Sequence, residues 1–397
     1  MGRMTRALSF LLCGSLLPLV SPTAADTLVF ENFTQNGGTF NVVNDTVLLV
    51  THDSNDPTLA LTNSAIANFA GATVIGSLTG ESGTLFIDGG STLANTGTLT
   101  SLGTYGSQTV FRGVGYIGLN SGSTGTATVT GAGSTWANSS NLSVGYSGQG
   151  TLLVEDGGAV TNSTGYIGRF SGSTGTATVT GAGSTWTNNG NLILGGWSLT
   201  NATTGTGALL VLDGGLVEVD DTTKVHEDSS IILSTNGLLV TNTLDNDGML
   251  GGTGTITGNV VNAGTVAPGL SPGILFIDGD YTQTSAGLLE FEIGGPLPGT
   301  DYDVLQVSGQ VTLAGMVSIL LDGYTPALGD TFQILEFDSL LDDGFSFDFS
   351  GAPLSGGLQW DTSQFLSSGI LQLTPEPGRA MLLVTGLLIL LSRRGRR

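Results

Sequence analysis

Residues 121–136 read SGSTGTATVTGAGSTW, and residues 171–186 repeat the same letters without change. The agreement extends outward on both sides. Tyr116-Ile117-Gly118 returns as Tyr166-Ile167-Gly168, and Asn141-Leu142 returns as Asn191-Leu192. A fixed period in this length range indicates a solenoid or another array of stacked units.

Each period contains two turns of chain. One strand type ends on regularly recurring glycines, namely Gly118, Gly145, Gly168 and Gly195. A second type reads GTLFIDGG from Gly83, GTATVTGAG from Gly125, GTLLVEDGG from Gly150 and GALLVLDGG from Gly207. In the second type, the second and fourth residues after the glycine are apolar, which is the period of a strand with one buried face. These inward positions are Leu85 and Ile87, Ala127 and Val129, Leu152 and Val154, and Leu209 and Val211.

The pattern predicts an all-β fold, a right-handed parallel β-helix over residues 26–266. A β-propeller has repeats of similar length and is the main alternative. After a Pro/Gly-rich segment, longer strands richer in Phe, Leu and Ile predict a C-terminal β cap or a small β-sandwich-like module over residues 267–373. Such a cap would protect the open end of a solenoid from aggregation.

The N-terminus has the pattern of a secretory signal peptide over residues 1–25. Arg3 and Arg6 precede the apolar stretch Ala7–Val20, and Thr23-Ala24-Ala25 offers small residues for cleavage. The stretch is short for a first transmembrane helix. Cys13 is the sole cysteine, so a processed chain has no disulfide, thiol catalyst or thiolate metal site.

The charge is strongly negative, with 32 acidic and 10 basic residues. Only Arg112, Arg169 and Lys224 lie between the basic clusters at the two ends. Such a surface repels phosphate backbones, so we expect no nucleic-acid partner.

Residues 374–397 differ from everything before them. Pro375-Glu376-Pro377 precede the apolar run Ala380–Leu391, which predicts a helix in the membrane. A basic stop follows, expected on the cytoplasmic side, and consists of Arg393, Arg394, Arg396 and Arg397. A plain membrane anchor is the alternative interpretation.

This three-part tail resembles the PEP-CTERM sorting signal, which exosortases of Gram-negative bacteria recognise. The resemblance implies export by the Sec machinery and transient anchoring in the inner membrane. It also implies cleavage near Pro375–Pro377 by an exosortase-type enzyme, followed by delivery to the cell surface or extracellular matrix.

The repeats Tyr116–Gly158 and Tyr166–Gly215 resemble a repeat shared by type V autotransporter passengers and PEP-CTERM proteins. Residues 251–293 resemble the region that ends such passenger β-helices. This likeness implies a β-helix with a surface role, often adhesive, and brings no catalytic residues with it.

Two sets of side chains are candidates for ligand contacts. Trp136 and Trp186 end the identical blocks, and either stack on a glycan or fill the core, which is the simpler interpretation. Asp88, Asp156 and Asp213 precede Gly-Gly pairs, and either line a calcium ladder or form tight turns. Asp-Gly favours turns, so we expect no cofactor.

We therefore expect an exported structural or adhesin-like protein and no enzymatic activity. The alternative is a glycan-binding or carbohydrate-active β-helix protein, a lyase or hydrolase, with polysaccharide as partner. Catalysis of that kind needs paired carboxylates. The local pairs are Asp220/Asp221, Asp301/Asp303 and Asp342/Asp343, and we expect them to be turn residues. Asn138 and Asn162 begin glycosylation sequons.

Overall fold

The computed structural model is almost entirely β-structure. It describes residues 27–30, 33–36, 38–42, 47–50, 58–69, 72–77, 80–96, 101–105, 107–269 and 272–376. The predicted signal peptide, the apolar run and the basic stop lie outside these ranges. None of the described helices is long and apolar enough to cross a membrane. The chain forms two compact units, Met1–Leu250 with Gly254–Gly258, and Gly251–Thr253 with Asn259–Arg397.

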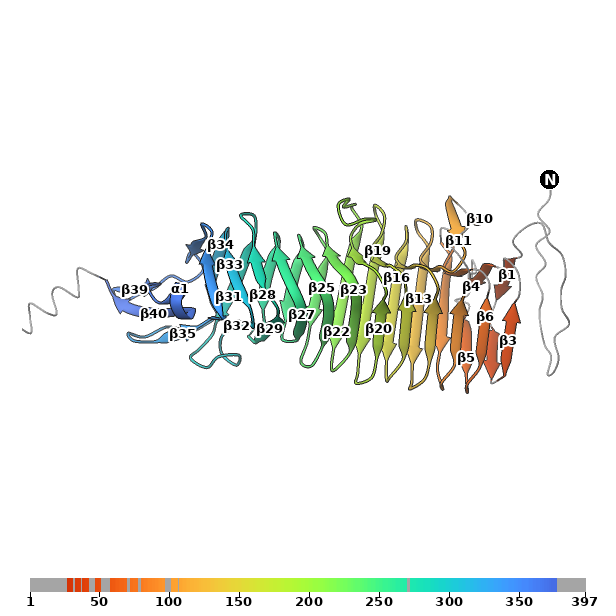
Figure 1. The fold of residues 1–397 in the computed structure, drawn as a ribbon, viewed down its shortest axis with the longest axis horizontal. Helices are drawn as coiled ribbons and strands as arrows, with labels where there is room; N and C mark the ends of the chain where they lie inside the picture. Colours follow the sequence, from red (N-terminus) through yellow and green to blue (C-terminus); the bar gives the residue numbers. More distant parts are fainter. Residues whose placement is uncertain are drawn as a thin grey trace, which may run out of the picture. The chain divides into compact units, whose positions relative to one another are not determined.

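The first unit consists of stacked coils whose strands form three parallel ladders, here called faces 1, 2 and 3 (Figure 1). A coil runs through face 2, then face 3, then face 1. Face 2 contains β2 (Phe33–Asn36), β5 (Thr58–Thr62), β8 (Ser82–Ile87), β13 (Thr124–Thr130), β16 (Gln149–Glu155), β19 (Thr174–Thr180), β22 (Thr206–Leu212) and β24 (Ser230–Leu233).

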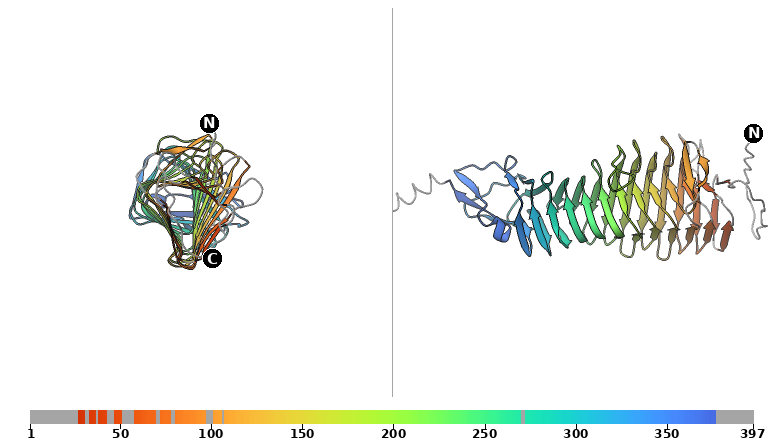
Figure 2. Two further views of the ribbon diagram at one scale, coloured as in Figure 1. Left: turned by 90° about the vertical axis from the view of Figure 1, so that its right-hand side faces the viewer. Right: turned by 45° about the horizontal axis from the view of Figure 1, so that its top comes forward.

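Face 3 contains β3 (Thr39–Val42), β6 (Ile66–Phe69), β9 (Thr92–Asn95), β14 (Thr135–Asn138), β17 (Ala159–Asn162) and β20 (Thr185–Asn188). Face 1 contains β1 (Thr27–Phe30), β4 (Val47–Val50), β7 (Ala72–Ile75), β12 (Gly115–Ile117), β15 (Leu142–Val144), β18 (Gly165–Ile167) and β21 (Leu192–Leu194). The strands β23 (Leu216–Val225) and β25 (Leu238–Asn246) are longer. The first part of each strand belongs to face 3 and the second part to face 1. The predicted parallel β-helix is confirmed (Figure 2).

The register follows the glycines identified in the sequence. Gly83, Gly125, Gly150, Gly175 and Gly207 are Cα partners in one column of face 2. The apolar residues two and four positions later are fully buried. Thr124 pairs with Gln149, which pairs with Thr174, so the 50-residue period of the sequence corresponds to two coils.

Large and small core residues alternate between coils. In the Trp coils (β13–β15 and β19–β21), an indole on face 3 accompanies Ala127 or Ala177 on face 2. In the Gly coils (β8, β9 and β12; β16–β18), face 1 begins with Gly115 or Gly165 instead of leucine. A Cβ at Gly165 would lie 3.1 Å from Cζ2 of Trp186. The indole of one coil therefore needs the glycine of its neighbour.

A ladder of buried asparagines accompanies this core. Asn95 Nδ2 donates to Asn138 Oδ1 at 2.6 Å, and Asn162 Nδ2 donates to Asn188 Oδ1 at 2.7 Å. Buried polar groups are retained at low free-energy cost when they are hydrogen-bonded to one another.

An insertion covers part of face 1. The antiparallel hairpin of β10 (Ser101–Tyr105) and β11 (Gln108–Phe111) contributes Val110 to a cluster with Tyr116 and Tyr146. Tyr116 and Ser143 are outward positions of face 1, yet both are buried. Face 1 is therefore a covered face over these coils.

In the second unit, parallel ladders continue beyond Val266, where the sequence predicted that the regular solenoid ends. The first contains β27 (Thr255–Asn262), β30 (Tyr281–Gln283), β33 (Gln310–Leu313) and β37 (Ser339–Asp342). The second contains β28 (Thr265–Pro268), β31 (Leu288–Ile293), β34 (Met316–Leu321) and β38 (Ser346–Asp348). The third contains β29 (Ile274–Asp278), β32 (Val304–Val307) and β36 (Leu335–Glu336). β26 (Met249–Gly252) lies where the sequence passes between the units.

Pro268 ends β28, so the Pro/Gly-rich segment separates two strands and does not change the fold. The boundary at 266/267 stays a prediction. The antiparallel part of the described chain after that boundary is a small sheet of β35 (Thr331–Gln333), β40 (Ile370–Pro375) and β39 (Leu358–Asp361). The short helix α1 (Phe365–Ser368) precedes its central strand.

The small sheet has its own aromatic core. The Phe332 ring lies 5.4 Å from that of Tyr302 and 5.9 Å from that of Trp360. Phe365 of α1 packs against Phe347 at 4.8 Å.

Candidate interaction surface

The two tryptophans of the identical blocks do not reach the surface. Trp136 and Trp186 are both 0% exposed. Trp186 Nε1 donates to Asn162 Oδ1 at 2.7 Å inside the core. Trp136 Nε1 has no such partner, and the equivalent Asn95 Oδ1 accepts from Thr73 Oγ1. Glycan stacking on these rings is therefore excluded in the folded chain, and the core-filling interpretation is correct.

The sequons at Asn138 and Asn162 coincide with the buried asparagine ladder. Their side-chain amides face the interior, so a glycan cannot be attached to either in the folded protein. Glycosylation of these two positions is excluded for that physical reason.

The aspartates before Gly-Gly pairs lie in turns between faces 2 and 3. Asp156 and Asp213 have φ of 52° and 50°, the left-handed conformation that Asp tolerates better than most residues. The Trp coil between them carries Gly181 in the corresponding turn, so acids recur in every second coil. Within the described ranges, no group of three or more His, Cys, Asp or Glu side chains is arranged to hold a metal ion.

In two of the candidate acid pairs, a carboxylate accepts a hydrogen bond from a backbone N–H group. Asp301 Oδ2 accepts from the Leu297 N–H at 3.1 Å, and Asp342 Oδ1 accepts from the Gly344 N–H at 2.9 Å. Both are turn contacts, as predicted for Asp301 and Asp342. The turn prediction is wrong for the third pair, because Asp220 and Asp221 lie within β23. There the backbone carbonyl of Asp220 accepts from Asn242 Nδ2 at 2.6 Å.

Asp303 is a buried carboxylate that joins three segments of the second unit. Its oxygens accept from the N–H groups of Gly273 at 2.9 Å and Glu292 at 2.8 Å. Burial raises the pKa of Asp303 to about 6, although these two donors act in the opposite direction. The group therefore has a structural role that the sequence did not reveal.

A second charged site lies in the first unit. Buried Lys224 places Nζ 2.9 Å from Asp245 Oδ2 and 2.6 Å from Asp247 Oδ2. His226 Nε2 lies 2.9 Å from the carbonyl oxygen of Ser198. Two carboxylates neutralise the buried amine, which is the arrangement that a buried cation requires.

Arg169 is likewise held within the protein. Its guanidinium carbon lies 3.8 Å from the ring centroid of Tyr166, 5.2 Å from that of Tyr146 and 5.3 Å from that of Phe170. Its Nη1 donates to Ser143 Oγ at 3.3 Å. The aromatic cluster stabilises the cation by cation–π attraction and is structural.

Face 2 of the first unit remains accessible. Its outward side chains form two columns that run from coil to coil. The threonine column consists of Thr58, Thr84, Thr126, Thr151 and Thr176. The alternating column consists of Phe86, Thr128, Leu153, Thr178 and Leu210. All ten are partly or fully exposed, in contrast to the covered outward positions of face 1.

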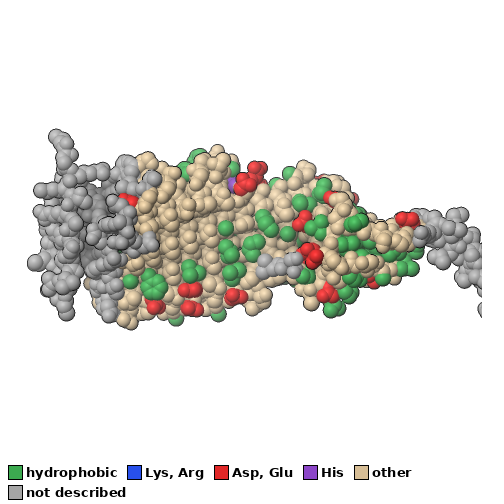
Figure 3. Space-filling model, turned by 180° about the vertical axis from the view of Figure 1, so that it is seen from behind, with side chains coloured by type: hydrophobic (Ala, Val, Ile, Leu, Met, Phe, Trp, Pro, Cys, Tyr) green, Lys and Arg blue, Asp and Glu red, His purple; other side chains and the backbone are tan. Residues whose placement is uncertain are grey.

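Face 2 is also almost free of charge. Strands β5, β8, β13, β16, β19, β22 and β24 contain one charged residue, Glu155. Figure 3 shows acidic side chains in small separate groups on a largely uncharged surface. The sequence-based prediction named the inward apolar positions of these strands. The outward threonines were therefore not predicted as columns. Their recurrence at fixed offsets from the glycines was the available signal.

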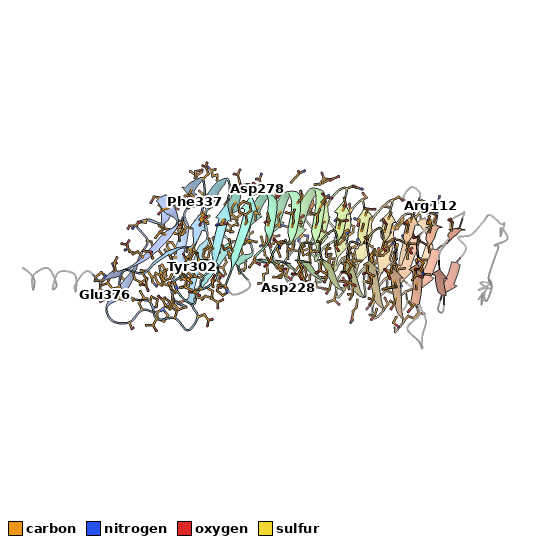
Figure 4. All side chains as sticks on the ribbon, turned by 90° about the horizontal axis from the view of Figure 1, so that it is seen from below. Arg112, Asp228, Asp278, Tyr302, Phe337 and Glu376 are labelled. Atoms are coloured by element: carbon orange, nitrogen blue, oxygen red, sulfur yellow. The ribbon has the colours of Figure 1, made fainter. Side chains whose placement is uncertain are left out.

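The described chain ends inside the predicted sorting motif. Pro375 is the last residue of β40 and pairs with Leu358. Glu376, labelled in Figure 4, follows β40 directly. Its N–H donates to the Gly357 carbonyl oxygen at 3.0 Å. Pro377 lies outside the described residues. The first two motif residues are thus joined to a folded sheet without a linker.

Comparison with known proteins gave matches among solved structures alone. No family model and no curated protein matches the sequence. The crystal structure of the Haemophilus influenzae Hap adhesin is similar at 14% identity and a TM-score of 0.31, over 89% of this chain and 33% of that one. The TibC-catalysed hyper-glycosylated TibA fragment is similar at 16% identity and a TM-score of 0.25, over 82% and 99% of the two chains. The chain matches about a third of the Hap adhesin, and its β-helix assignment rests on its own strand registers.

Proposed function

We propose that this chain is an exported, surface-anchored structural protein of the adhesin type, acting at the cell surface or in the extracellular matrix. The observation that carries the proposal is the in-register stack of coils in the first unit, whose face 2 repeats the same outward side chains from coil to coil. A repeated, rigid surface suits attachment better than turnover of a small substrate.

The termini support the same proposal. A signal-like N-terminus and a tail resembling the PEP-CTERM signal provide export and anchoring. An exosortase-type enzyme then processes the chain near Pro375–Pro377 after Sec-dependent export. The position of Pro375 at the end of β40 supports processing close to the folded sheet.

A carbohydrate-active enzyme is the weaker candidate. Its chemistry needs two carboxylates that face one substrate. Asp301, Asp303 and Asp342 instead bind backbone N–H groups.

Deletion of Pro375–Arg397 tests the proposal in the native host. The truncated chain should appear in the medium, whereas the intact chain stays with the cells. A Pro375→Ala/Glu376→Ala variant that keeps the apolar run is the matched control, and should stay membrane-bound at the mass of the uncleaved chain. Surface retention of the truncated protein at the level of the intact one would contradict the sorting role. Retention of the intact chain at full mass would instead support a plain anchor.

A further inference from the structure

Face 2 of the first unit combines hydroxyl and apolar groups in regular rows. The threonine column offers one hydroxyl per coil from Thr58 to Thr176. Beside it, the alternating column presents Leu153 between Thr128 and Thr178. Hydroxyls both donate and accept hydrogen bonds, whereas the aliphatic groups favour contact with apolar C–H surface.

The charges around face 2 restrict its partner. Acids lie along one edge, in the turns that hold Asp88, Asp156 and Asp213, while the strands carry only Glu155. An anionic polymer finds no positive charge on the strands of face 2 and is repelled by the aspartates at this edge. A second copy of this acidic chain would bring its own row of aspartates to the contact. The charge pattern therefore favours a neutral partner.

The repeat of the surface restricts the partner further. Because the two 16-residue blocks are identical, Thr126 and Thr128 return as Thr176 and Thr178 two coils later. Strands in a ladder are about 4.8 Å apart, so this pattern recurs about every 10 Å along the stack. A polymer of identical units can make the same contacts at each recurrence, whereas an irregular protein surface cannot.

We propose that face 2 of the first unit is the binding surface for a neutral, unbranched polysaccharide. Sugar hydroxyls hydrogen-bond to the threonine column, directly or through water, and the C–H surfaces of the sugar rings lie on Leu153, Leu210 and Phe86. This inference deepens the proposed adhesive function and depends on it for access to an external matrix.

The test compares two variants of the full chain that each add two negative charges. The face 2 variant is Thr151→Glu/Thr176→Glu, and the matched control is Thr161→Glu/Thr185→Glu on the outward side of face 3. Retention is measured on insoluble cellulose, amylose and chitin, and on carboxymethyl cellulose, which carries negative charge on the cellulose backbone. Circular dichroism and the unfolding temperature establish that both variants remain folded.

We expect the unaltered chain to be retained on at least one neutral polymer and not on carboxymethyl cellulose. The face 2 variant should lose at least tenfold in retention, and the face 3 variant should match the unaltered chain. Equal retention of the two variants, or no retention on any neutral polymer, would overturn the inference. A dimer in light scattering that only the face 2 variant loses would also overturn it, because the face would then bind a second copy. Surface location, tested by the tail deletion, is measured independently of these outcomes.

Discussion

The indole Nε1 of Trp186 donates a 2.7 Å hydrogen bond to Oδ1 of Asn162, which lies one coil away. The same asparagine donates through Nδ2 to Asn188. One buried amide therefore binds two side chains of the neighbouring coil, Trp186 and Asn188.

Replacing Asn162 with Ala should destabilise the first unit. The change leaves the Trp186 N–H without its acceptor and the Asn188 carbonyl without its donor, and unsatisfied buried groups of this kind cost about 2 kcal/mol. Denaturant unfolding followed by tryptophan fluorescence measures the loss. The exposed neighbour Asn189→Ala is the control and should unfold as the unaltered chain does. Equal midpoints for the two variants would show that the buried amide contributes nothing.

Trp186→Ala and Trp197→Ala should differ sharply. Trp186 is completely buried, so its truncation leaves a cavity and costs about 3–5 kcal/mol. Trp197 is 47% exposed, and its truncation should change the unfolding free energy by no more than about 0.5 kcal/mol. Thermal unfolding of both variants gives the comparison. A similar shift for both would refute the assignment of Trp186 to the core.

Gly150→Ala should be more damaging than Gly172→Ala. A Cβ at Gly150 would lie 2.1 Å from the Gly145 nitrogen, a backbone atom that cannot move away independently, and overpacking costs about 3 kcal/mol. Gly172 has φ of +76° but no atom within 4 Å of an added Cβ, so only backbone strain of about 1 kcal/mol applies. Chemical denaturation of the two variants ranks them, and the reverse order would argue against the glycine column as a close-packed contact.

Asp303 should make stability depend on pH in a defined direction. Its folded pKa of about 6 lies above the ordinary value of 3.8, so the folded state binds the proton more tightly than the unfolded state. The stabilising contribution is therefore fully present below about pH 4 and is lost as the pH rises through about 6. Asp303→Asn cannot titrate, so the stability advantage of the unaltered chain over this variant should shrink across that window. Unfolding midpoints at a series of pH values measure it, and parallel curves would contradict the assignment.

The sequence predicted the register of the first unit well, because glycines mark the same point of each coil. Gly83, Gly125, Gly150 and Gly207, aligned by pattern alone, are indeed Cα partners within one column. Alternating apolar residues behind them then determine which side chains point inward. Such local patterns can be predicted from the sequence because equivalent strands pack against the core in the same way.

Contacts between different faces could not be predicted from the sequence. The pairing of Trp186 with Gly165 depends on how far an indole reaches across the coil, which spacing alone does not reveal. The burial of Asp303 depends on segments that meet only after folding. The Pro/Gly-rich segment does not reveal from its composition that Pro268 occupies a strand end, where its missing N–H is tolerated.

The alternation of Trp coils and Gly coils has a consequence for how such a chain can change in length. Removal of residues 124–173 would join Ser123 to Thr174 and set Trp186 over Gly115, a neighbour equivalent to the one it has now. Removal of half that segment would bring two coils of the same kind together, with indoles crowded at one junction or a void at another. Gene duplication or loss in this region is therefore structurally silent only in even numbers of coils.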